Sequence, residues 1–156
     1  MLKLAGLDGD TGLTVEENRK LNVVRDVTRA APDFGFPDCY DQGGRACSTT
    51  TAPVALLPAH AGVGGVAVTP DWGGRGLTAF VAESGSVVGG LDAGRELRRI
   101  ELRRRPGGGY DATESVFATG FGEQDALGTA IGPGGALYLT LWGTGAVVRF
   151  FPGYSH

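Results

Sequence analysis

Residues 65–70 read GVAVTP, and after a glycine-rich turn the chain continues with LTAFV at 77–81 and GSVV at 85–88. The same order of short apolar runs and turns returns later, as GTAIGP at 128–133, ALYL at 136–139 and GAVV at 145–148. A unit of roughly 40–60 residues that is built from short strands and recurs along the chain is typical of β-propeller blades. The repeat therefore predicts about two blades.

Glycine dominates the composition, with 28 of the 156 residues against a usual share of about 7%. The glycines stand between short apolar runs, where tight turns need backbone conformations that other residues adopt only with strain. No segment of about ten residues keeps the apolar period of a helix without a Gly or Pro. We therefore predict an all-β chain.

The charge and the lengths of the apolar runs exclude two kinds of partner. The formal net charge of −3 gives no reason to expect a nucleic acid or an anionic membrane surface. No apolar run approaches the roughly 20 residues that a membrane-spanning helix needs. We expect neither nucleic acid nor membrane among the partners.

We expect residues 1–156 to form one partial β-propeller domain, with about two to two and a half four-stranded antiparallel blades. Residues 1–62 would supply a short strand and a long loop, residues 63–121 a first blade unit, and residues 122–156 a second, incomplete one. Residues 96–103 alternate apolar and charged side chains, which predicts a half-exposed strand at the outer edge of a blade.

A propeller closes only with four or more blades around its axis. We therefore expect this chain to be a fragment, and its partners to be the remaining blades or another chain.

Two cysteines flank a polar turn in the long loop. Cys39 and Cys47 would close a short ring as a disulfide, which would place the chain outside the cytoplasm, in the periplasm or secreted. The alternative is a pair of free thiols.

Common catalytic motifs are absent from the sequence. There is no P-loop, no complete dinucleotide-binding glycine motif and no nucleophile elbow in its usual strand–helix context. His60 stands in a loop before the first repeat, where it would serve either as a general base or as a structural loop residue.

Four stretches resemble the glucose/sorbosone dehydrogenase family of soluble quinoprotein propellers, in the same order along the chain. They are KLNVV at 20–24, DFGFPDCY at 33–40, APVALLPAHA at 52–61 and IGPGGALYL at 131–139. The resemblance covers residues from about 16 to 150 and the C-terminal part of such a propeller. It implies oxidation of a sugar, an aldose or sorbosone, with pyrroloquinoline quinone (PQQ) and calcium.

The positions that the resemblance assigns to cofactors hold unsuitable residues. Lys20 and Phe34 stand where calcium-binding members would supply ligands, although calcium takes oxygen donors. Asp125 and Leu127 stand where two arginines would clamp the quinone. The catalytic histidine of the family belongs to an earlier blade. We therefore expect no cofactor and no metal in this chain, and no complete catalytic machinery.

Two functional interpretations remain open. The chain is either the C-terminal portion of a PQQ-dependent sugar dehydrogenase propeller or a non-catalytic propeller module that binds a carbohydrate or a protein. Under the first interpretation, Glu83 would line the channel mouth beside His60, and Trp142 would stack on a sugar ring. A metal-dependent lactonase-like propeller is a weaker third interpretation, because its ligands cannot be assembled here.

Overall fold

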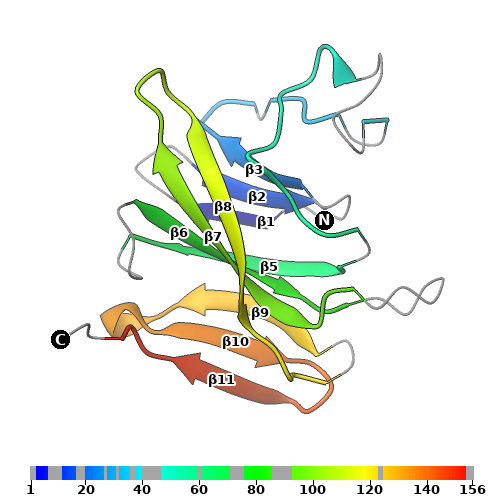
Figure 1. The fold of residues 1–156 in the computed structure, drawn as a ribbon, viewed down its shortest axis with the longest axis vertical. Coiled ribbons are helices and arrows are strands. Elements are labelled where there is room, and N and C mark those ends of the chain that lie inside the picture. Colours follow the sequence, from blue (N-terminus) through cyan, green and yellow to red (C-terminus); the bar gives the residue numbers. More distant parts are fainter. Residues whose placement is uncertain are drawn as a thin grey trace.

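The computed structural model describes residues 3–6, 12–16, 20–26, 28–30, 32–35, 38–39, 47–59, 61–70, 76–85, 93–122 and 125–153. These residues form three antiparallel sheets that lie one above the other (Figure 1). Within these ranges the helical structure is limited to short 3-10 turns such as Pro133–Gly135, and no helix is long and apolar enough to cross a membrane. The predicted all-β partial propeller is confirmed.

Each sheet is a meander in which consecutive strands are neighbours. The first sheet contains β1 (Lys3–Gly6), β2 (Gly12–Glu16), β3 (Lys20–Val24) and β4 (Ala55–Leu56). The second contains β5 (Val63–Thr69), β6 (Leu77–Glu83), β7 (Glu96–Arg104) and β8 (Tyr110–Ala118). The third contains β9 (Ala126–Ile131), β10 (Leu137–Leu141) and β11 (Ala146–Phe150). The first strands of the sheets contact one another, since β5 touches both β1 and β9, as the inner strands of blades do.

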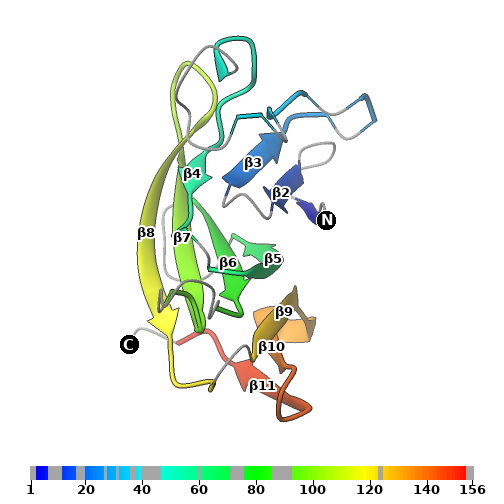
Figure 2. The same ribbon diagram turned by 90° about the vertical axis from the view of Figure 1, so that its right-hand side faces the viewer.

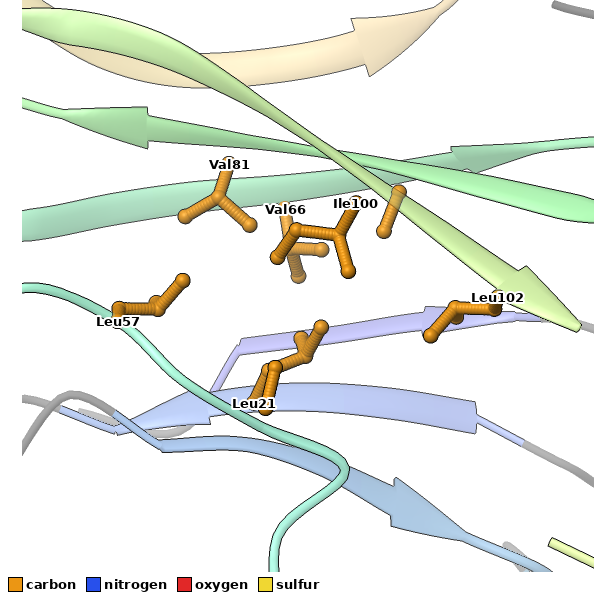
Figure 3. Close-up of a cluster of buried hydrophobic side chains, with 8 residues drawn as sticks. Leu21, Leu57, Val66, Val81, Ile100 and Leu102 are labelled. Atoms are coloured by element: carbon orange, nitrogen blue, oxygen red, sulfur yellow. The ribbon is translucent and has the colours of Figure 1, made fainter. Parts of the chain in front are cut away.

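The inner strands of the second sheet, β5 and β6, are buried on both faces because they lie between the other two sheets. Successive side chains of a strand point to opposite faces, and β6 uses this alternation. Ala79 and Val81 join a core shared with Leu21 of the first sheet, whereas Phe80 and Ala82 join a core shared with Leu137 of the third. Figure 3 shows the first of these cores, with Val81 and Val66 facing Leu21. The near-continuous apolar sequence of β6 follows from this double burial.

Glycine is required where the second and third sheets meet. Gly64 in β5 lies so close to β9 that a Cβ atom there would overlap the carbonyl oxygen of Leu127. The chain therefore brings two inner strands together through a position without a side chain.

The structure differs from the sequence prediction in three strands. A hairpin, β1–β2, lies within residues 1–62, where only a short strand and a long loop were expected, and it completes a four-stranded first sheet with β3 and β4. The third strand of the second sheet is β7, and the run at 86–88 falls outside the described residues. The predicted outer-edge position of 96–103 is wrong, because β7 pairs with β6 on one side and with β8 on the other.

The antiparallel order brings several strand ends to one end of the stack. In the second sheet, β5 and β7 begin at this end and β6 ends there. In the third sheet, β9 and β11 begin at one end and β10 ends there. The two ends coincide because Gly64, near the start of β5, lies against Leu127, near the start of β9. These strand ends, on the right in Figure 1, are named the site end below.

Candidate functional site

The site end carries three of the residues that the sequence singled out. Glu83 is the last residue of β6, Asp125 directly precedes β9, and Trp142 directly follows β10. His60, the proposed general base, lies outside the described residues. Antiparallel pairing therefore gathers residues from positions 83 to 142 at one end of the fold.

Glu83 is the centre of a buried group of charges on the second sheet. Its side chain is fully buried, and Arg98 Nε of β7 donates to its Oε1 atom at 2.9 Å. Arg98 also bonds Glu96, and its Nη1 atom lies 3.9 Å from Glu114 Oε2 on β8. The other carboxylate oxygen, Glu83 Oε2, is buried with no hydrogen-bond partner among the described residues. One guanidinium thus faces three carboxylates from three neighbouring strands.

Burial raises the pKa of Glu83 from 4.5 to about 7, because an ionised carboxylate loses its hydration there. The hydrogen bond and positive charge of Arg98 oppose this rise, and the negative charge of Glu96 adds to it. Burial also raises the pKa of Glu114. The group therefore contains a carboxyl that exchanges a proton near neutral pH, which is a property of many binding and catalytic sites.

Sequence reasoning missed Arg98. The charged alternation at 96–103 suggested a half-exposed strand, but Arg98 leaves only 13% of its side chain exposed. The usable signal was the placement of acidic residues on the two flanking strands, since Glu83 and Glu114 come from β6 and β8. That signal needs the strand register, which the sequence alone does not fix.

Asp125 holds the turn between β10 and β11. Only 3% of this residue is exposed. Its Oδ1 atom accepts hydrogen bonds from the backbone N–H groups of Gly143 and, at 3.3 Å, Thr144. Its own carbonyl oxygen accepts the N–H of Trp142 at 2.8 Å. The carboxylate is therefore committed to the main chain of the turn.

The neighbouring side chains of this turn face the solvent. Trp142 is 74% exposed and Leu127 is 36% exposed. The indole plane of Trp142 is thus free to contact a ligand, whereas Leu127 offers only an apolar side chain. Arg95, Gly120, Phe121 and Gly122 line a shallow open depression of about 270 Å³ in the loops beside the second and third sheets.

Neither cofactor that the resemblance implies fits the assigned residues. A quinone with anionic groups needs cationic donors, and Asp125 and Leu127 supply a buried carboxylate and an alkyl chain. Calcium needs several oxygen ligands, and Lys20 brings an ammonium group to the first sheet instead. The described residues contain no cluster of His, Cys, Asp and Glu that would hold a metal ion.

Described residues of the long loop contact β3, and a disulfide joins two residues of the loop. Cys39 and Cys47 are bonded, with Cα atoms 5.2 Å apart, so the predicted pairing is confirmed. Lys20 at the start of β3 is fully buried and reaches the carbonyl oxygens of Phe34 and Cys39 in this loop. Phe34 contributes its carbonyl, while its ring is buried.

Two solved structures resemble this chain. An oxidoreductase of Thermus thermophilus that is named as a glucose dehydrogenase matches with a TM-score of 0.61 and 20% sequence identity, over 88% of this chain and 37% of its own. The PQQ domain of pyranose dehydrogenase from Coprinopsis cinerea, in its holo form, matches with a TM-score of 0.59 and 16% identity, over 94% of this chain and 47% of its own.

The chain shares the fold of these oxidoreductase domains. It spans less than half the length of either of them. No protein-family model and no curated protein matches the sequence. The likeness agrees with the family resemblance at the level of the fold.

Proposed function

We propose that this chain forms part of a sugar-dehydrogenase-type propeller and supplies its framework and a sugar-facing end without holding the quinone. The observation that carries the proposal is the state of Asp125. Asp125 stands where the family resemblance expects a quinone-clamping arginine, and its carboxylate is buried and accepts the N–H groups of Gly143 and Thr144. Any quinone chemistry of such a propeller is then carried out by residues other than Asp125 and Leu127, or it has been lost.

A titration with PQQ and calcium tests this proposal. The absorbance of PQQ is followed as the purified chain is added, and dye reduction is then measured with an aldose. We expect no saturable change and no reduction. Saturable binding followed by aldose-dependent dye reduction would refute the proposal, since the chain would then hold a working quinone site.

The alternative function, a non-catalytic module that binds a carbohydrate, is favoured by the exposure of Trp142. A flat indole presents an apolar face to the C–H groups of a sugar ring, and its exposed fraction is 74%.

Tryptophan fluorescence separates this alternative from binding of a protein. Trp72 and Trp142 are the two tryptophans of the chain, so Trp72→Phe leaves Trp142 as the reporter. We expect saturable quenching by an aldose in Trp72→Phe, and titration calorimetry with the same aldose should show a loss of affinity in Trp142→Ala. Unchanged affinity in Trp142→Ala would remove Trp142 from the sugar site.

We propose that the partner is the rest of a propeller or another chain, which completes the third sheet. No described strand pairs with the free side of β11, whereas the first and second sheets have four strands. Val147 and Phe151 at this edge are each 62% exposed. Such an edge pairs readily with a further strand. Sedimentation tests this: Val147→Lys should weaken association if β11 is the contact.

The disulfide supports a place outside the cytoplasm, where such bonds persist. Mass spectrometry of the protein from its native source, alkylated with and without reductant, tests this location. Equal alkylation of Cys39 and Cys47 in both samples would argue against it.

A further inference from the structure

We infer that the ammonium group of Lys20 takes the place of a structural calcium ion, so that the loop of residues 32–54 is fastened to the first sheet without metal. The inference starts from a mismatch. Lys20 stands at a position that would supply a calcium ligand, but its side chain carries the cation instead. The inference concerns only the loop and is independent of the function proposed above.

The surroundings of Lys20 are those of a bound cation. Nζ donates to the carbonyl oxygen of Phe34 at 2.6 Å and to that of Cys39. The side chain is fully buried, and no carboxylate among the described residues forms an ion pair with it. Burying an ammonium is costly unless oxygen atoms replace its water, and here main-chain carbonyls do so.

The two carbonyls belong to opposite ends of one turn. The N–H of Cys39 donates to the carbonyl of Gly35 at 2.6 Å, which closes the turn between Phe34 and Cys39. Beyond this turn, the disulfide joins Cys39 to Cys47. At the end of the loop, the N–H of Val54 donates to the carbonyl oxygen of Leu21 in β3 at 2.7 Å. Lys20 thus ties both ends of the turn to the first residue of β3.

A further polar group lies on the same face of β3. Asn22 stands two residues after Lys20, so both side chains leave the strand on one side. Asn22 is fully buried, and both polar atoms of its amide have no hydrogen-bond partner among the described residues. This face of β3 therefore carries two buried polar side chains, of which only Lys20 has hydrogen-bond partners among the described residues.

The wild-type protein gives the first test. Its thermal midpoint should be the same in EDTA and in calcium, since no ion is needed. A rise of several degrees with calcium, or a fall with EDTA, would refute the inference.

Chemical modification gives a second test that needs no variant. Lys3 and Lys20 are the two lysines of the chain. Acetylation of the native protein should spare Lys20, in EDTA as well as in calcium, and acetylation in denaturant should modify it. Equal modification in the native and the denatured protein would overturn the inference, because Lys20 would then not be held by the loop.

Charge exchange gives the third test. Lys20→Glu would place a carboxylate beside the two carbonyls and so create oxygen donors of the kind that calcium prefers over magnesium in flexible sites. We expect Lys20→Glu to have a lower thermal midpoint in EDTA, which calcium restores by several degrees and magnesium restores less. Lys20→Gln is the matched control and should respond to neither ion.

Limited proteolysis of Lys20→Met is the fourth test, because this variant keeps an unbranched side chain that is one atom shorter and removes the charge. Cleavage between residues 25 and 59 should be faster than in the wild type. Unchanged cleavage, or a folded Lys20→Glu that ignores calcium, would show that the carbonyls do not form a cation position.

Discussion

Glu83 links the protonation of one carboxyl group to the stability of the fold. Its pKa is raised from 4.5 in the unfolded chain to about 7 in the folded one. Between these pH values the folded chain holds a proton that the unfolded chain releases, so the free energy of unfolding decreases as the pH rises. We expect a decrease of up to about 3 kcal/mol across this window from Glu83. Chemical denaturation at several pH values measures it.

Glu83→Gln should flatten this pH dependence, because its amide stays neutral while Arg98 keeps Glu96 as a partner. Glu101→Gln is a suitable control, since Glu101 pairs with Arg99 on the same sheet but leaves 45% of its side chain exposed. An equal pH dependence in Glu83→Gln and the wild type would contradict the assignment to Glu83.

Asp125 gives a prediction about the turn between β10 and β11. Asp125→Ala removes the acceptor for two backbone N–H groups, which should lower the free energy of unfolding by about 1–3 kcal/mol. Asp125→Asn keeps one acceptor oxygen and should cost less. Urea denaturation compares the three proteins. If Asp125→Ala were as stable as the wild type, the carboxylate would be free for another role.

The residues of the site end were only partly accessible to sequence reasoning. The family resemblance singled out Asp125, and the sugar-dehydrogenase interpretation singled out Trp142. The spacing of Cys39 and Cys47 in a polar loop predicted their bond. The partners of Glu83 and Lys20 were not predictable, for two different reasons. Arg98 meets Glu83 only through the register of β6 and β7, and Lys20 bonds main-chain carbonyls, which every residue possesses.

At the scale of elements, the join between β5 and β9 depends on Gly64. Gly64→Ala places a methyl group against the carbonyl of Leu127, which should force the strands apart and cost about 2 kcal/mol or more. Gly107→Ala is the matched control, since nothing lies within 4 Å of its added carbon. Thermal unfolding of both variants measures the difference. Equal midpoints would show that the strands separate without cost.

The strands of the middle and last sheets follow their sequence signals more closely than those of the first. Apolar runs such as 77–81 and 137–139 predicted β6 and β10, because both are buried against neighbouring sheets. The β1–β2 hairpin has no comparable run, and pairing with β3 supports it. The alternation of charged and apolar residues in β7 suggested a strand at the edge of the sheet. Inside the sheet, the charge of Arg98 is instead paired with Glu83 on β6 and Glu114 on β8.

The molecule as a whole is a row of three sheets rather than a closed ring (Figure 2). Aromatic contacts help to join the last two sheets: Phe117 of β8 meets Phe80 and Phe150 edge-to-face, with ring centroids 5.0 Å and 5.4 Å apart. The outer sheets each have one sheet neighbour, and the middle sheet has two.

This difference in neighbours sets the order in which backbone amides should exchange with deuterium. β6 is covered on both faces, so its amides can exchange only when the whole fold opens. The amides of β11 lie in a sheet with one neighbour and should exchange through smaller, local openings. Mass spectrometry should show much slower deuterium uptake in peptides from 77–83 than in peptides from 146–150. A further strand that pairs with β11 should slow the uptake at 146–150 and so reduce this difference.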